Sequence, residues 1–169
     1  MAYALLILTV ALAMPHIPAQ GAAPPPSVAK EYLEGHNKAR AEVGVGPLKW
    51  SEELANASRR LVRYQKRNMG CGLTSLNNHK YGGNQLWTIN NKTMTPRTAV
   101  DKWVQEKEHY IYNFNECMSY FRTCVYYTQV VWRKSLELGC AQARCSQYGT
   151  SLTLCFYNPP GNIKGERPY

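Results

Sequence analysis

The sequence predicts an α+β sandwich, and the order of its segments is the main reason. Apolar residues at helical spacing occupy much of the first half of the chain, whereas strand-like segments lie toward its end. Helices that precede most of the strands favour an α+β fold over a wound parallel sheet. The length of 169 residues, with 44% hydrophobic and 18% charged residues, is typical of one globular domain.

A short apolar run near the start predicts export. Leu5–Met14 carries no charge, is too short to span a membrane, and is followed by Pro15 and small residues, as in secretory signal peptides. We expect a signal peptide over residues 1–23, cleaved between about Ala19 and Ala23, with a buried N-terminal helix as the alternative. The sequence holds no other such run, so we expect no transmembrane segment and a soluble mature chain.

A Pro-rich tether is predicted next, over residues 24–30, because consecutive prolines cannot start a strand ladder. The folded domain should follow over residues 31–169 and end in a tail over residues 159–169. A first helix is predicted to begin inside this tether. Apolar positions recur at helical spacing from Ser27 to Arg40, and Ser27 is available as its N-cap.

Two further helices are predicted along the chain. The first can be capped by Ser51 and should run to about Asn68. The segment Asn77–Asn91 is rich in glycine and asparagine and is expected to be a loop. Pro96 suits the first turn of a third helix that ends near His109.

The segments beyond His109 are predicted to be irregular or extended. Residues 110–124 are aromatic and polar without helical periodicity, so we expect an irregular segment there. Strands are predicted over Tyr127–Trp132, Leu136–Cys145 and Ser151–Tyr157, with a hairpin turn at residues 147–149.

Six cysteines, all beyond the signal peptide, predict three disulfides, because an even number in an exported chain favours cross-links over metal ligands. A zinc site is the alternative, but the sequence has no CxxC pair. Fifteen pairings are compatible with the sequence. The short loops Cys117–Cys124 and Cys145–Cys155 could close locally, which would leave Cys71 to pair with Cys140.

The net charge of +9 makes the chain strongly basic. Such a charge attracts acidic cell-wall polysaccharide, anionic lipid or nucleic acid, and a solvated basic surface is the plainer alternative. The basic residues are scattered, apart from a run at Arg59, Arg60, Arg63, Lys66 and Arg67. The sequence holds no nucleic-acid-binding motif, so we expect no nucleic-acid partner and a monomeric protein.

Several short motifs together resemble one known family. In chain order they are HNKAR (36–40), VGVGPLKW (43–50), the cysteine and Gly-Asn loop (71–87), AVDKWVQEK (99–107), YTQVVWRKS (127–135), LGCAQARC (138–145) and the terminal RPY. Their order and spacing resemble the plant pathogenesis-related protein 1 (PR-1) branch of the CAP superfamily, over about Glu31–Tyr169. The resemblance implies an α-β-α sandwich and the pairing Cys71–Cys140, Cys117–Cys124 and Cys145–Cys155. It also implies a role in defence or stress response, in the apoplast, cell wall or vacuole.

Members of this family commonly carry two histidines and two glutamates in a central cleft, where these side chains can hold a divalent metal. The corresponding positions here are Ser75 (or Leu76), Gly83, Glu106 and Tyr126, so a single carboxylate remains. One carboxylate without the two imidazoles is not a zinc-type site, so we expect no metal, no cofactor and no catalysis.

A reduced site is the alternative. His79 lies close in sequence to the lost histidine, and a shifted loop could bring it beside Glu106, which would give a metal-dependent hydrolase. The sequence holds no GxSxG, HExxH or phosphate-loop motif that would support another reaction.

Sterol or lipid binding is the second activity that the resemblance implies, through an aromatic segment next to the cleft. The corresponding aromatic residues are Tyr110, Tyr112, Phe114, Tyr120 and Phe121. They could line an apolar groove or pack over the edge of the core.

The third implied function is release of a C-terminal signalling peptide, Pro159–Tyr169, by cleavage after Asn158. The junction reads CFYN, with Phe156 where the family has asparagine. A structural tail that wraps the domain is the alternative. Two sequons, at Asn56 and Asn91, predict glycosylation, and Asn91 is favoured because it falls in the predicted loop.

Overall fold

The computed structural model describes residues 26–76, 80–89, 94–118, 123–145 and 149–169. The elements in chain order are α1 (Pro26–Glu42), β1 (Lys49–Trp50), α2 (Glu52–Asn68), β2 (Gly82–Thr88), α3 (Pro96–Val104), η1 (Gln105–His109), β3 (Tyr110–Ile111), β4 (Glu116–Cys117), α4 (Val125–Val130), β5 (Glu137–Arg144) and β6 (Ser151–Asn158). Residues 1–23, predicted as a signal peptide, lie outside the described residues.

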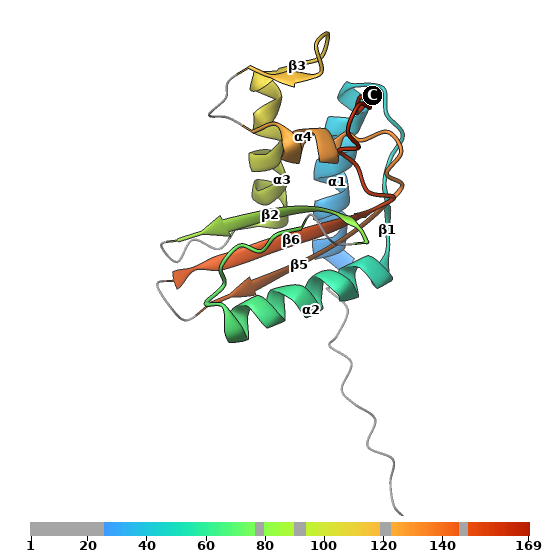
Figure 1. The fold of residues 1–169 in the computed structure, drawn as a ribbon. Coiled ribbons are helices and arrows are strands. Elements are labelled where there is room, and N and C mark those ends of the chain that lie inside the picture. Colours follow the sequence, from blue (N-terminus) through green and yellow to red (C-terminus); the bar gives the residue numbers. More distant parts are fainter. Residues whose placement is uncertain (1–25, 77–79, 90–93, 119–122, 146–148) are drawn as a thin grey trace, which may run out of the picture.

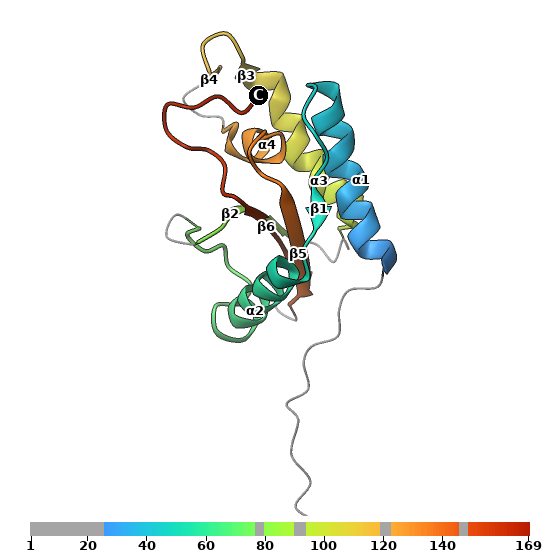
Figure 2. The same cartoon turned by 90° about the vertical axis from the view of Figure 1, so that its right-hand side faces the viewer.

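A four-stranded sheet in the order β1-β5-β6-β2 forms the middle layer. Figure 1 shows α2 along one face of the sheet and α1 and α3 over the other. In Figure 2 the sheet again separates α2 from these two helices. The predicted α-β-α sandwich is therefore confirmed, and each face of the sheet has its own apolar cluster.

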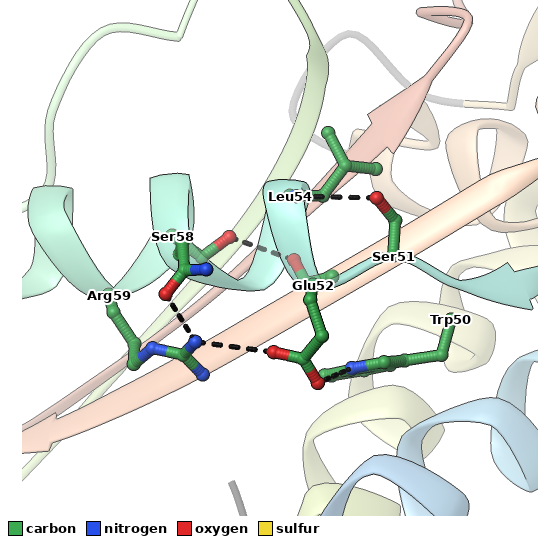
Figure 3. A network of polar contacts seen from close by, with 8 residues as sticks. Trp50, Ser51, Glu52, Leu54, Ser58 and Arg59 are labelled. Atoms are coloured by element: carbon green, nitrogen blue, oxygen red, sulfur yellow. Dashed lines mark hydrogen bonds and ion pairs between the residues drawn. The ribbon is translucent and has the colours of Figure 1, made fainter. Parts of the chain in front are cut away.

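Helix α2 begins and ends where the sequence predicts. The Ser51 hydroxyl accepts the backbone N–H of Leu54, which caps the helix. The indole of Trp50 donates to Glu52 at 2.8 Å, and Arg59 binds the same carboxylate (Figure 3). Gly139 on β5 lies so close to the backbone of α2 that a Cβ atom there would overlap it, so this helix packs directly on the strand.

Helix α1 carries a buried guanidinium that joins several segments. The Arg40 side chain is 1% exposed, and burial lowers its pKa to about 10. It donates to the backbone carbonyls of Gly46, Val130, Trp132 and Ser135. Because these carbonyls satisfy the charged group, Arg40 can fix α1 against the end of α4 inside the core.

Two disulfide pairings differ from the prediction. The structure joins Cys71 to Cys145, Cys117 to Cys124 and Cys140 to Cys155. Only the pairing of Cys117 with Cys124 is confirmed. Cys140 and Cys155 lie opposite each other in the β5–β6 register, so they bond to each other rather than to Cys71 and Cys145.

Two secondary-structure predictions were wrong. Residues of Tyr127–Trp132, predicted as a strand, lie in and just after α4. All six side chains are buried, so their sequence carries no helical stripe. The predicted loop Asn77–Asn91 contains β2, where pairing with β6 overrides the low strand propensity of its glycines. Residues 77–79 of that loop lie outside the described residues.

Smaller differences concern segment ends. Helix α1 begins at Pro26, so residues 26–30 are helical rather than part of a tether. The third helix ends as predicted near His109, with η1 as its last part. The segment 110–124 contains the small hairpin β3–β4. Strands β5 and β6 confirm the other two predicted strands.

Candidate functional site: a capped cleft and an anchored C-terminal tail

Glu106, the one carboxylate that remains of the family set, caps a helix. Its Oε2 accepts the backbone N–H of Tyr126 at 3.0 Å and that of Tyr127 at 3.1 Å. These groups lie in the first turn of α4, where backbone N–H groups lack partners within the helix. Burial raises the pKa of Glu106, and the two N–H groups oppose this by favouring the carboxylate. Glu106 therefore has a structural role in positioning α4.

The other cleft positions offer no metal ligand. Ser75 is exposed, and Gly83 lies on β2. A Cβ atom on Gly83 would lie 2.8 Å from Cδ1 of Leu76, so this leucine fills the space beside the strand. Leu76 itself packs against the apolar cluster under α2. The space beside Gly83 is therefore apolar, not a metal site.

Tyr126 is half-buried, and its backbone forms hydrogen bonds with the side chains of Asn84 and Glu106. Its carbonyl accepts the side-chain amide of Asn84 at 2.9 Å, and burial, followed by the charge of Glu106, raises the pKa of its phenol. Asn84 is fully buried, and its Oδ1 has no hydrogen-bond partner in the described part of the chain. Sequence analysis did not identify Asn84, because only the pairing of β2 with β6 brings it to the cleft.

A metal does not fit the described side chains. In the ranges that the structure describes, no three His, Cys, Asp or Glu residues lie close enough to hold an ion. A polar cavity of about 470 Å³ is lined by Glu106, Glu108 and His109, together with uncharged side chains and Lys102. His79, the residue invoked for a reduced site, lies outside the described residues.

The aromatic segment packs against the end of the chain. The ring of Tyr112 stacks on that of Tyr169, with centroids 4.8 Å apart, and its hydroxyl donates to the Tyr169 carbonyl at 2.9 Å. Tyr110 contacts the rings of both Tyr127 and Tyr169, and burial raises its pKa to about 12. Phe114 is 72% exposed. Tyr120 and Phe121 of the same segment lie outside the described residues.

A cavity of about 240 Å³ lies between the β3–β4 hairpin, α4 and the tail. We call it the tail cavity, and its apolar walls come from Tyr110, the Cys117–Cys124 disulfide, Val125, Trp132 and Ile163. The apolar residues Met118, Val125 and Ile163 are exposed on these same segments. The exposed surface here thus combines a concave part with apolar side chains.

Side chains of α4 and the loop after it anchor the tail. The Ser135 hydroxyl donates to the Pro159 carbonyl at 2.8 Å, and the Gln129 amide oxygen accepts the N–H of Gly161 at 3.0 Å. The Asn162 side chain binds both Thr128 and the carbonyl of Val125. Further along, Lys134 forms an ion pair with Glu166, and the N–H of Arg133 donates to Pro168. The tail therefore wraps the domain.

The junction for peptide release lies at the end of a strand. Asn158 is the last residue of β6, where it pairs with Glu137. Its carbonyl accepts the N–H of Leu136, and its side chain donates to Glu137 at 2.8 Å. Pro159, the next residue, is exposed. A protease therefore has to free Asn158 from the sheet before it can cleave after this residue.

The two sequons differ in what the structure shows. Asn56 lies within α2, as predicted, yet it is exposed, and its Oδ1 accepts a hydrogen bond from Arg59. Asn91 lies outside the described residues.

None of the helices in the described ranges has the length and apolar character needed to cross a membrane.

Comparison with known proteins assigns the family. The family described as cysteine-rich secretory protein family (CAP) matches residues 33–157. STS14 protein of Solanum tuberosum is 55% identical over 141 residues, which cover 83% of this chain and 65% of that protein. The PR-1 type protein of Sambucus nigra is 41% identical over 140 residues, covering 83% of this chain and 81% of that protein.

The fold has solved counterparts. Venom allergen-like protein 4 of Schistosoma mansoni matches with a TM-score of 0.61 at 25% identity, covering 83% of this chain and 92% of that chain. The family match and these relatives identify the chain as a member of the CAP family and of its plant pathogenesis-related protein 1 branch.

Proposed function

We propose that this protein is a secreted PR-1-type defence or stress-response protein that binds a sterol or lipid at the tail cavity and catalyses no reaction. It acts in the apoplast, the cell wall or the vacuole, after removal of residues 1–23 as a signal peptide. The family assignment supports the defence role, because relatives from Sambucus nigra and Arabidopsis thaliana are pathogenesis-related proteins by name.

The tail cavity is the observation that carries this proposal. Its walls combine apolar side chains, among them Val125, Trp132 and Ile163, with polar ones from the hairpin, α4 and the tail, and this mixed lining suits an amphipathic ligand with a polar end. A volume of about 240 Å³ is smaller than a whole sterol site needs, so the cavity receives one end of the ligand. The exposed side chains of Phe114 and Met118 then cover the remainder.

The role of Glu106 supports binding over catalysis. A general base or metal ligand needs a carboxylate that faces the reacting group. Here one oxygen of Glu106 accepts two backbone N–H groups of α4, and in the described part of the chain no three His, Cys, Asp or Glu residues lie close enough together to hold a metal ion. The carboxylate is committed to holding the helix that forms one wall of the tail cavity.

Titration with a fluorescent sterol tests the binding proposal. The double variant Val125→Ser, Ile163→Ser removes two apolar walls, and we expect its sterol affinity to fall by about tenfold or more. The matched control is Leu73→Ser, Leu136→Ser, which changes two leucines of similar exposure outside the cavity. Equal affinities of the two double variants would contradict the proposal.

Calorimetric titration with zinc tests the alternative, a metal-dependent hydrolase with a reduced site. We expect no stoichiometric binding, because the described side chains form no ligand set. Tight zinc binding that Glu106→Gln abolishes would overturn the non-enzymatic part of the proposal.

A second function, as precursor of the peptide 159–169, rests on the exposure of the tail. Pro159 and residues 162–165 are exposed, and the tail forms no strand beyond Asn158. Mass spectrometry of extracellular fluid should detect a peptide that begins at Pro159. If only the intact C-terminus is recovered after the defence response has been induced, the precursor role is wrong.

A further inference from the structure

The outer side of α2 carries a group of cations that the proposed function does not use. The second half of this helix, Arg59–Asn68, contains five basic residues and no acidic one. The two carboxylates of α2 lie in its first turn and already have partners: Glu52 binds Trp50 and Arg59, and Glu53 accepts the hydroxyl of Tyr81. Of the five basic residues, only Arg59 is paired with one of these carboxylates.

The fold separates these cations from the core. The buried side of α2, which includes Leu54, Ser58 and Val62, packs on the sheet. At 100° per residue, Arg60, Arg63 and Arg67 project from the opposite side, with Lys66 at its edge. All four are exposed, and we call them the cationic face of α2.

The cationic face has no internal counter-charge. Among the described residues, five ion pairs occur, and none of them includes a residue of this face. Arg60 and Arg67 lie two turns apart, about 10.5 Å along the helix axis, with Arg63 between them. The positive charges therefore form a short row on a rigid element.

Apolar surface adjoins the row. Tyr64 is 56% exposed between Arg60 and Arg67, and Met69 and Leu73 are similarly exposed just beyond the end of the helix. Tyrosine and arginine side by side are enriched in binding surfaces, because both provide large contact area with a polar group at the tip. Figure 1 shows α2 alone on its face of the sheet, away from α4 and the tail.

We propose that the cationic face of α2 binds a linear, carboxylate-bearing polysaccharide such as polygalacturonate. Three of the four cations are arginines, whose planar guanidinium binds a carboxylate through two parallel hydrogen bonds. A row of charges about 10.5 Å long fits successive carboxylates of one polymer chain better than a single small anion. The ring of Tyr64 provides a flat surface for a sugar between the guanidinium groups.

The geometry disfavours a membrane as the partner. A helix that lies in a lipid interface directs its apolar side into the bilayer. The apolar side of α2 is buried against β5 and β6, and the side that faces outward is cationic. The cationic face of α2 therefore recognises its partner mainly through charge.

Binding to immobilised polygalacturonate tests the proposal at low ionic strength, where screening is weak. In the variant Arg60→Gln, Arg63→Gln, Arg67→Gln, we expect the affinity to fall by about tenfold or more, because three charge contacts are lost. The matched control Lys38→Gln, Lys102→Gln, Arg133→Gln removes three exposed charges elsewhere and should change the affinity by less than about twofold. Equal losses in both variants would show attraction by net charge alone and overturn the proposal.

Two further measurements distinguish the partners. Fully methyl-esterified polygalacturonate should bind at least about tenfold more weakly than the free acid, and equal binding would contradict carboxylate recognition. Vesicles of phosphatidylserine and phosphatidylcholine should bind no better to the parent protein than to the α2 variant. Loss of vesicle binding with unchanged polygalacturonate binding would assign the face to membranes and overturn the proposal.

Folding of the variants is checked by circular dichroism and thermal unfolding. A single charge reversal, Arg63→Glu, provides a second test that perturbs the helix less, with Lys38→Glu as its control. We expect only Arg63→Glu to weaken polygalacturonate binding, by several-fold. This outcome does not depend on the tail cavity, so it can hold even if sterol binding fails.

Discussion

The carboxylate of Glu106 accepts the backbone N–H of Tyr127 at 3.1 Å, across a sequence separation of 21 residues. The same oxygen accepts the neighbouring N–H of Tyr126. Through these contacts η1 fixes the start of α4, which carries Val125 of the tail cavity and Gln129 of the tail anchor. The family's last cleft carboxylate is therefore linked to the C-terminal surface.

Loss of this cap should destabilise the protein. We expect Glu106→Ala to lower the free energy of unfolding by about 0.5–2 kcal/mol, the usual cost of a lost N-terminal cap. Glu106→Gln should cost less, because its amide oxygen can still accept the two N–H groups. Urea unfolding at neutral pH measures both values. Equal losses for the two variants would mean that the charge, rather than the acceptor, is the stabilising feature.

His36 should make stability depend on pH. It is fully buried between the Tyr32 carbonyl and the Tyr157 hydroxyl, and burial lowers its pKa from 6.5 to about 4. Between these values the unfolded chain binds a proton that the folded chain does not, so the free energy of unfolding falls as the pH falls. The loss should reach about 3 kcal/mol once the pH is below the folded value.

The ring resonance of His36 in an NMR titration provides the direct check. A folded-state midpoint near 4 is expected, and a midpoint near 6.5 would remove the cause of the pH dependence. His36→Gln should flatten the pH dependence of urea unfolding in this window, provided that the variant folds.

The disulfides should differ in their contribution to stability. Cys71–Cys145 closes a sequence separation of 74 residues, whereas Cys117–Cys124 closes only 7. In the chain-entropy description, replacing the first pair by serine costs about 4 kcal/mol and replacing the second about 2 kcal/mol. Thermal unfolding of the two double variants measures the order. Peptide mapping without reduction checks the pairing itself, and a Cys71–Cys140 peptide would contradict it.

Tyr169 should stabilise the whole C-terminal surface. Its ring contacts those of Tyr110 and Tyr112, so Tyr169→Ala should lower the free energy of unfolding by about 1–3 kcal/mol. Phe114→Ala is the control, because this ring is 72% exposed and its loss should change stability by less than about 0.5 kcal/mol. Similar effects of the two variants in urea unfolding would show that the aromatic contacts of Tyr169 add little.

Local signals explain which elements could be predicted. Helix α2 was predicted correctly because Ser51 and the acidic first turn directly precede its apolar periodicity. Strands β5 and β6 were predicted from apolar, strand-forming residues in short runs. Helix α4 was not, because its cap comes from Glu106, far away in sequence, and four consecutive residues of the helix, Tyr127–Val130, are buried, so no helical stripe is visible.

The same distinction applies to the candidate site. The absence of the family's imidazoles at Ser75 and Tyr126 could be read from the sequence, since it concerns residue identity alone. The contact of Leu76 with Gly83 could not, because it depends on how the chain approaches β2. The stacking of Tyr112 on Tyr169 was likewise not predicted, because 57 residues separate the two rings.

By itself the sequence determined the fold class, the α2 boundaries, three cross-links from six cysteines and the loss of the metal ligands, because these follow from residue identity and short-range pattern. Only the tertiary structure decided which cysteines pair, since the β5–β6 register places Cys140 opposite Cys155. It also decided that Glu106 caps a helix and that the tail forms one wall of a cavity. Such contacts join segments far apart in the chain, and their geometry exists only after the sheet and helices have packed together.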